Sequence, residues 1–151
     1  MTIIYTKGDI FLADAQAIVN PVNCVGIMGK GLALQFKNKF PDNFKAYVEA
    51  CKIPHKVETG HLFVFDTGTT NNPRHIINFP TKKHWRDPSK LEYLEVGLMD
   101  LVRVICQRQL MSVALPPLGC GLGGLAWSDV GPLITKHLEE VPYVTVYVFE
   151  P

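Results

Sequence analysis

The chain has 151 residues, of which 47% are hydrophobic and 19% charged, and its formal net charge is +1. This length suits one domain with a sizeable core. The near-neutral charge excludes a general electrostatic binder of nucleic acid or membranes, so any nucleic-acid contact must come from a local patch.

Targeting, membrane and metal signals are missing from the sequence. No run approaches the ~18 apolar residues of a membrane span, and Asp9 and Asp14 interrupt the early apolar residues where a signal peptide would lie. The four cysteines form no C-x-x-C pair, which predicts reduced thiols in a cytoplasmic protein. The acidic residues do not cluster, so no metal is expected.

The first half of the chain alternates short β-branched runs with helical patterns. Strands are predicted at residues 3–5 and 17–20, with about one helical turn over 10–14 between them. Leu32, Phe36 and Phe40 recur on one helical face that ends at Pro41. A second helix is expected from Phe44, Val48 and Cys51, followed by strands at 62–66 and 76–78.

The second half continues the same alternation. Ser89 and Glu92 form a capping-box pattern before an apolar helical stripe. A strand is predicted at 113–115, Ser128 is expected to cap a last helix, and a final strand is predicted at 144–149. The order of elements indicates an α/β fold. The two apolar helical faces comprise Leu91, Leu94, Leu98, Leu101 and Ile105, then Val130, Leu133, Ile134 and Leu138.

Two glycine-rich segments, Gly26–Gly31 and Gly119–Gly124, each lie between a buried-looking strand and a helix. Backbone amides without a Cβ beside them, next to a helix N-terminus, suit phosphate oxygens. Ligands of open α/β sheets bind at the carboxyl ends of strands, so the two segments predict two walls of one crevice. Neither segment is a Walker A or a G-x-G-x-x-G sequence, and the alternative is that both are merely tight turns.

Together these segments resemble the macrodomain family. The matching residues are Gly8-Asp9-Ile10, the run Ala-Ile-Val-Asn-Pro-Val-Asn at 17–23, the first glycine segment, and residues 116–124. Met-Gly-Lys-Gly at 28–31 and Asn-Phe-Pro-Thr-Lys-Lys-His-Trp-Arg at 78–86 resemble one branch of it. That branch contains the terminal ADP-ribose glycohydrolases and bacterial antitoxins that remove ADP-ribose from thymidine in DNA. The resemblance implies a mixed sheet of about six strands between helices.

The resemblance also implies roles for individual residues. Asp9 accepts a hydrogen bond from the adenine amino group, Ile10 offers its N–H to the ring, and Asn23 binds the distal ribose. Asp9 can equally cap the short helix that follows it. Asn20 either binds as well or holds the loop, and Phe149 is a candidate to pack on the adenine. The remaining substrate-binding positions are Val22, Cys24, Gly29, Lys30, Gly31 and Leu32, with Gly119, Cys120, Gly121, Leu122 and Gly123 at the diphosphate.

Lys82 is the candidate catalytic residue, because the matching lysine is catalytic in the glycohydrolases that this segment resembles. An amine can attack the anomeric C1″ of ADP-ribose, or trap the opened sugar as a Schiff base. Alternatively, the ammonium stays cationic and stabilises the departing group. The terminal ADP-ribose glycohydrolases carry an assisting Asp in the late glycine loop, and the matching residue here is Gly123.

The segment after Lys82 combines cations with an aromatic side chain. Lys83, Trp85 and Arg86 suit a single DNA strand, in which phosphates meet the cations and a base stacks on the ring. The alternative places Trp85 in the core beside a solvated basic turn.

The leading hypothesis is a cofactor-free DNA ADP-ribosyl glycohydrolase, the antitoxin to a DNA ADP-ribosyltransferase toxin. The alternatives are a hydrolase of ADP-ribosylated acidic side chains or of O-acetyl-ADP-ribose, and a non-catalytic ADP-ribose reader. A plain dinucleotide-binding domain is disfavoured because 151 residues leave no substrate domain. Residues 1–151 are expected to form a single macrodomain, either alone or as the N-terminal domain of a longer antitoxin.

Overall fold

The computed structural model describes residues 2–151 and contains one six-stranded sheet in the order β1-β6-β5-β2-β4-β3. Five strands run parallel and β3 runs antiparallel to β4, so the predicted mixed sheet of six strands is confirmed. The strands are β1 (Thr2–Thr6), β2 (Ala17–Val22), β3 (Phe63–Asp66), β4 (His75–Pro80), β5 (Ser112–Leu115) and β6 (Thr145–Phe149).

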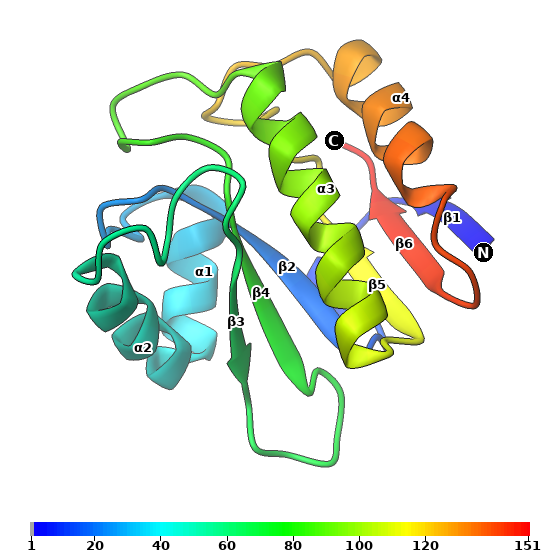
Figure 1. Ribbon diagram of the computed structural model, residues 1–151, viewed down its shortest axis with the longest axis horizontal. Coiled ribbons are helices and arrows are strands. Elements are labelled where there is room, and N and C mark those ends of the chain that lie inside the picture. The colour runs from blue at the N-terminus through cyan, green and yellow to red at the C-terminus, as the bar shows by residue number, and fades with distance from the viewer. Residues whose placement is uncertain (1) are drawn as a thin grey trace.

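Helices cover both faces of the sheet (Figure 1). The two helices α3 and α4 lie side by side on one face, while α1 packs against β2 on the other and α2 lies beside β3. A short 3₁₀ turn, η1, connects β1 to β2 where about one helical turn was predicted. The helical elements are η1 (Ile10–Leu12), α1 (Gly31–Lys39), α2 (Pro41–Cys51), α3 (Leu91–Arg108) and α4 (Trp127–Leu138).

The core follows from the alternation of side chains along the central strands. In β2, Ala17 and Val19 pack with the residues of α3 and α4, whereas Ile18 packs with Phe36 of α1. All four side chains are 0% exposed. Because successive residues of a strand point to opposite faces, a sheet covered on both faces needs continuous apolar runs such as this one.

The limits of β2 differ from the sequence prediction, whereas the break between the first two helices agrees with it. β2 continues through Pro21 to Val22, because both residues stay in parallel register with β4. The break between α1 and α2 falls at Pro41 as predicted, where proline is the first residue of the second helix.

Both predicted serine caps are wrong. Lys90 and Ala126 occupy the N-cap positions of α3 and α4, and neither makes a side-chain capping bond. The Ser89 N–H donates instead to the carbonyl oxygen of Gly123 at 3.0 Å, so Ser89 is bonded to the second glycine-rich segment. Ser128 lies inside α4 and is exposed.

Candidate functional site

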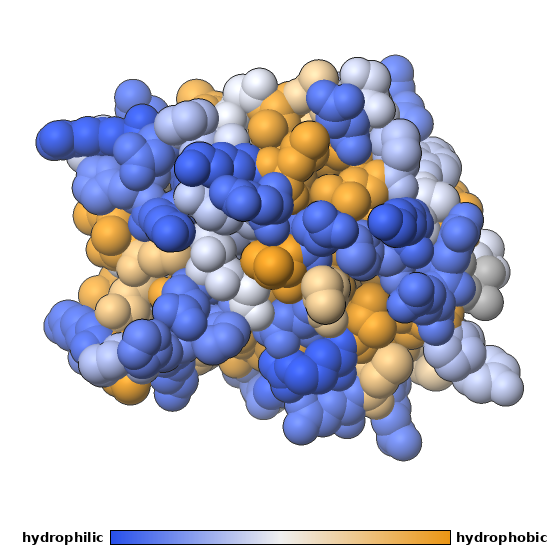
Figure 2. Space-filling view, turned by 45° about the horizontal axis from the view of Figure 1, so that its top comes forward, coloured by the Kyte–Doolittle hydropathy of each residue, from blue (hydrophilic) through white to orange (hydrophobic). Residues whose placement is uncertain are grey.

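The segments that carry the predicted site lie at one edge of the sheet. Because β1, β2, β4 and β5 are parallel, their carboxyl ends share an edge, and the segments after them begin there. From β2 the chain continues towards β3, and from β5 it continues towards β6 on the other side. Such a divergence of neighbouring strands is where open α/β sheets bind ligands. Figure 2 turns this edge forward and shows polar side chains around apolar patches.

The first glycine loop, residues 23–30, is held in shape by Asn23. The Asn23 Oδ1 accepts the N–H groups of Val25 at 3.0 Å and Ile27 at 3.4 Å, while its Nδ2 donates to the Ile27 carbonyl at 2.8 Å. The hydroxyl of Tyr47 donates to both oxygens of Asn23. Burial raises the pKa of Tyr47, so this hydroxyl stays a neutral donor. Asn23 is 6% exposed, and most of its hydrogen-bonding capacity goes to the loop.

This loop leads into an open helix N-terminus. Lys30 is the N-cap of α1 and supplies no side-chain cap. Among residues 2–151, no acceptor meets the amide N–H groups of positions 29–32, and Gly29, Lys30 and Gly31 are exposed. Uncapped N–H groups at a helix N-terminus favour an anionic or strongly polar ligand.

The second glycine loop, residues 119–124, is tied at its two ends. The Leu125 N–H donates to the Gly119 carbonyl at 2.9 Å, and the Gly123 carbonyl accepts the N–H of Ser89. Within residues 2–151, the N–H groups of 121–123 have no acceptor. A Cβ on Gly31 would lie 3.4 Å from the Leu122 side chain, so the two glycine loops are neighbours. The two sets of free amides therefore belong to neighbouring loops.

Lys82 lies directly beside the first glycine loop. The Thr81 N–H donates to the Val22 carbonyl at 2.9 Å, and the Cys24 N–H donates to the Lys83 carbonyl at 3.1 Å. These bonds extend the pairing of β2 and β4 past the ends of both strands. Lys82 is half-buried, and its Nζ donates to the Trp85 carbonyl at 3.4 Å, across its own turn.

The Cys24 thiol also faces this segment, with its Sγ 3.6 Å from the Lys82 carbonyl oxygen. Burial raises the pKa of Cys24 to about 11, with a smaller contribution from Cys51. A thiol nucleophile requires the thiolate form. Cys24 is therefore neutral near pH 7 and is not a candidate nucleophile.

Three residues predicted to bind substrate are buried or have a backbone group bonded within the protein. Asn20 is 0% exposed, and its Nδ2 donates to Asn78 Oδ1 at 3.1 Å. Val22 is 3% exposed and the Cys24 N–H is already bonded to Lys83. Their contacts hold β2 and the first glycine loop in place. For Asn20, these contacts fit the alternative in which its side chain holds the loop.

The residues predicted to contact adenine lie near the ends of β1 and β6. Asp9 Oδ1 accepts the Phe11 N–H at 2.9 Å, so Asp9 caps η1 while its other carboxylate oxygen carries no bond within residues 2–151. The Glu150 N–H donates to the Thr6 carbonyl at 2.8 Å, which keeps the ends of these strands together. Phe149 is 8% exposed and packs in the cluster that contains Ile10.

The basic segment after Lys82 is on the surface. Trp85 is 43% exposed, so the alternative that places it in the core is wrong. The Arg86 guanidinium carbon lies 4.7 Å from the Trp85 ring centroid. The Lys83 Nζ lies 5.7 Å from the ring centroid of Tyr93 in α3. Tyr93 was not identified from the sequence as a neighbour of this segment. An aromatic residue outside the apolar stripe of its helix was the feature that could have indicated it.

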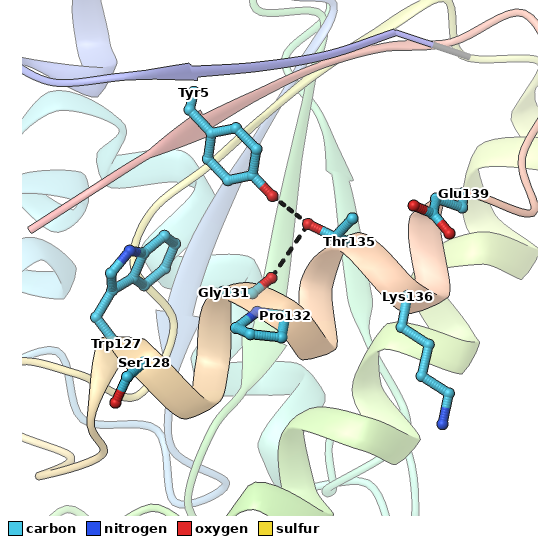
Figure 3. Close-up of a pocket in the computed structure, with 8 residues that line it drawn as sticks. All are labelled: Tyr5, Trp127, Ser128, Gly131, Pro132, Thr135, Lys136 and Glu139. Carbon is cyan, nitrogen blue, oxygen red and sulfur yellow. Dashed lines mark hydrogen bonds between the residues drawn. The ribbon is translucent and has the colours of Figure 1, made fainter.

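A separate groove of about 540 Å³ lies between β1 and α4 (Figure 3). Its lining includes Tyr5, whose hydroxyl points at the hydroxyl of Thr135, and the first residue of α4, Trp127. Neither glycine loop nor Lys82 belongs to this lining. We place the candidate site at the glycine loops, because the free amides and the candidate nucleophile gather there.

Along residues 2–151, none of the helices has the length and apolar character needed to span a bilayer. The same residues contain no group of three or more His, Cys, Asp or Glu side chains arranged to hold a metal ion.

Known proteins share both the sequence and this fold. A curated protein of Mycobacterium tuberculosis (strain ATCC 25618 / H37Rv) named "DNA ADP-ribosyl glycohydrolase" is 53% identical over 149 residues, 99% of this chain and 42% of that protein. The solved "Macrodomain of Thermus aquaticus DarG" is 51% identical, with a TM-score of 0.95 and 99% of each chain covered.

Thermosipho africanus provides a third relative. A curated "DNA ADP-ribosyl transferase-DNA ADP-ribosyl glycohydrolase fusion protein" is 36% identical over 159 residues, 94% of this chain and 40% of that protein. The structure "Thermosipho africanus DarTG in complex with ADP-ribose" has a TM-score of 0.91 at 34% identity, over 99% of this chain and 42% of that one. The chain thus spans about two-fifths of the length of these curated relatives.

The family model named "Macro domain" matches residues 19–134, which include both glycine loops and Lys82. Together with the fold and the relatives, this match shows that the chain belongs to the Macro domain family.

Proposed function

We propose that this macro domain is an ADP-ribosyl glycohydrolase that removes ADP-ribose from thymidine in single-stranded DNA. The observation that carries the proposal is the position of Lys82, which is fixed by backbone bonds to the first glycine loop beside the free amides. The names of the relatives support the same activity, and the ADP-ribose complex of the T. africanus protein supports the ligand.

In the proposed complex, the free amides of 121–123 and the N-terminus of α1 bind the diphosphate and the distal ribose. Asp9 and Ile10 contact the adenine, and Asn23 reaches the ribose with the remaining N–H of its amide. Preorganised backbone donors of this kind need no rearrangement when the ligand binds. The geometry would deliver the anomeric C1″ towards Lys82.

The net reaction adds water across the bond between C1″ and the base nitrogen. The hydroxyl ends on C1″, and the proton ends on the base. As a nucleophile, Lys82 would bond to C1″ while the base leaves with the bonding pair and takes up a proton. Opening of the ribose ring would then give a Schiff base on the lysine, which water would hydrolyse to release the amine. As a cation, Lys82 would stabilise the leaving base while water attacks. Reduction with borohydride during turnover distinguishes the two, because only a Schiff base is trapped on the lysine.

A cognate DNA ADP-ribosyltransferase is the proposed partner, because the T. africanus relative joins both activities in one protein by name. We further propose that residues 1–151 act as one domain and that the protein works in the cytoplasm. Four thiols without a disulfide fit a reducing compartment.

A comparison of two substrates tests the proposed function. The protein is incubated with an oligonucleotide carrying ADP-ribosyl-thymidine and with a protein carrying ADP-ribosyl-glutamate, and free ADP-ribose is measured. We expect turnover of the DNA substrate at least tenfold faster by kcat/KM. Preference for the protein substrate would contradict the DNA assignment, and binding without turnover of either would make the chain a reader.

A further inference from the structure

A polar groove of about 500 Å³ lies beside the Lys82 segment, and the proposed reaction does not use it. Lys83 forms one side of it. Residues 59–61 and the first two turns of α3, with Glu92, Tyr93 and Val96, form the rest.

The walls of this groove are fixed by local packing. Gly60 has φ +87, and a Cβ added there would lie 3.3 Å from Val96 Cγ2, so the backbone contacts α3 closely. The His61 N–H donates to the Glu58 carbonyl at 2.8 Å, which closes the turn before β3. The groove is therefore present before any ligand binds.

Tyr93 and two lysines give the groove its chemical character. The Nζ atoms of Lys83 and Lys90 lie 5.7 Å and 5.6 Å from the Tyr93 ring centroid. Glu92 is the one carboxylate in the lining. An aromatic face with neighbouring ammonium groups is the combination that binds single-stranded nucleic acid, through base stacking and phosphate contacts.

The groove adjoins the candidate reaction site through Lys83. Lys83 follows Lys82 directly, and its carbonyl accepts the N–H of Cys24 from the first glycine loop. Consecutive Cα atoms are about 3.8 Å apart, so a strand held at Lys82 has its next nucleotide within reach of the groove. Trp85 and Arg86, also exposed, extend the basic surface on the same turn.

We propose that this groove is the subsite for a nucleotide that flanks the modified thymidine in a single DNA strand. The base of that nucleotide stacks on Tyr93, and its phosphate contacts Lys83 and Lys90. The inference rests on the proposed function and adds a determinant of substrate length and strand recognition.

The test compares oligonucleotides with ADP-ribosylated thymidine that carry a normal flanking nucleotide, an abasic one, or none, on the 5′ or the 3′ side. For wild type, we expect an abasic site on one of the two sides to raise KM about tenfold without changing kcat, as loss of one stacked base predicts. Tyr93→Ala should raise the KM for the intact substrate by the same factor as the abasic site does in wild type. The same variant should change the KM for the abasic substrate little. Tyr93→Phe, which keeps the ring, should restore the low KM.

Met99→Ala is the matched control, because Met99 is 59% exposed on α3 and does not line the groove. Equal KM for intact and abasic substrates on both sides would overturn the subsite, as would an equal effect of Tyr93→Ala on both. Absence of cleavage of every substrate by wild type would instead overturn the proposed function. The wild-type measurements keep the test valid if Tyr93→Ala does not fold.

Discussion

Position 123 has no room for a side chain. A Cβ there would lie 2.5 Å from the Gly119 carbonyl oxygen and 2.3 Å from Ser89 Oγ. This packing leaves no space for a side chain at the position where the resemblance places the assisting Asp of the terminal ADP-ribose glycohydrolases. In the proposed reaction, Lys82 therefore acts without a carboxylate from this loop position.

We expect Gly123→Ala to lower the free energy of unfolding by about 1–3 kcal/mol, as overpacking does. Gly121→Ala is the control, because no atom lies within 4 Å of its added Cβ. Urea unfolding measures both variants. Equal stability of the two would show that the loop rearranges freely and that the close packing at 123 is unimportant.

The Cys24 thiol provides a pH-dependent probe of the same loop. Burial raises its pKa to about 11 from the ordinary 9.0, whereas Cys106 is exposed. At pH 8 we expect iodoacetamide to modify Cys106 well before Cys24, because only the thiolate reacts. Labelling of Cys24 should accelerate as the pH approaches 11, and peptide mass spectrometry follows both sites.

The same shift has a consequence for stability. Because the folded state favours the neutral thiol, the contribution of Cys24 to the free energy of unfolding is fully present below pH 9. This contribution is lost as the pH rises through about 11. Comparable labelling rates of Cys24 and Cys106 at pH 8 would contradict this environment for Cys24.

Among the elements, β2, β4 and α2 are joined by a buried cluster of three asparagines. Asn78 Oδ1 accepts from Asn20 and Asn43, while its Nδ2 donates to Asn43 Oδ1 at 2.8 Å and to the Phe63 carbonyl at 3.1 Å. All three side chains are 0% exposed. This cluster fixes the end of β2 from which the first glycine loop begins.

Asn78→Ala should lower the free energy of unfolding by about 2–4 kcal/mol, because it removes the hydrogen bonds that Asn78 makes with two buried amides and with the Phe63 carbonyl. Asn38→Ala, at an exposed position of α1, should change it by less than about 0.5 kcal/mol. Chemical denaturation measures both. A loss below 1 kcal/mol for Asn78→Ala would mean that the neighbours rearrange to pair with one another.

The secondary structure was largely predictable because apolar periodicity reflects burial directly. The runs that became β2, β4 and β5 and the stripe of α3 from Leu94 to Ile105 point into the core, and each was identified from the sequence. Leu91, the first residue of the predicted stripe, is exposed instead. The predicted helix caps at Ser89 and Ser128 were wrong because tertiary contacts help to decide where a helix begins and which groups a serine contacts. Ser89 is held by a bond to Gly123, 34 positions along the chain, which no local pattern reveals.

For the whole molecule, the position of the candidate site in the fold was predictable, whereas the contacts of its individual residues were not. Two glycine segments after neighbouring strands were enough to place it at the carboxyl edge of the sheet. Which side chains face that edge depends on register, so Asn20 and Val22 emerged as supports. The Tyr93 groove combines segments far apart in sequence and was therefore not visible from any one of them.

The near-neutral net charge leads to a prediction about salt. About three cations, Lys83, Arg86 and Lys90, are available to phosphates. We therefore expect a slope of about −2 when the logarithm of the binding constant for unmodified single-stranded DNA is plotted against the logarithm of the salt concentration. Fluorescence anisotropy from 50 to 300 mM salt, in the range where such effects are measurable, gives this slope. A slope steeper than about −5 would require a much larger basic surface than the structure provides.

The most direct test of the central claim measures binding and cleavage on one variant, Lys82→Ala. Calorimetry with ADP-ribose and single-turnover cleavage of an ADP-ribosylated oligonucleotide are compared with wild type and with Lys136→Ala, an exposed lysine of the groove in Figure 3. We predict that Lys82→Ala binds ADP-ribose within about threefold of wild type and cleaves about 10²–10⁴-fold more slowly, while Lys136→Ala does both normally. Cleavage by Lys82→Ala at the wild-type rate, or no uptake of ADP-ribose by the folded wild-type protein, would contradict the account.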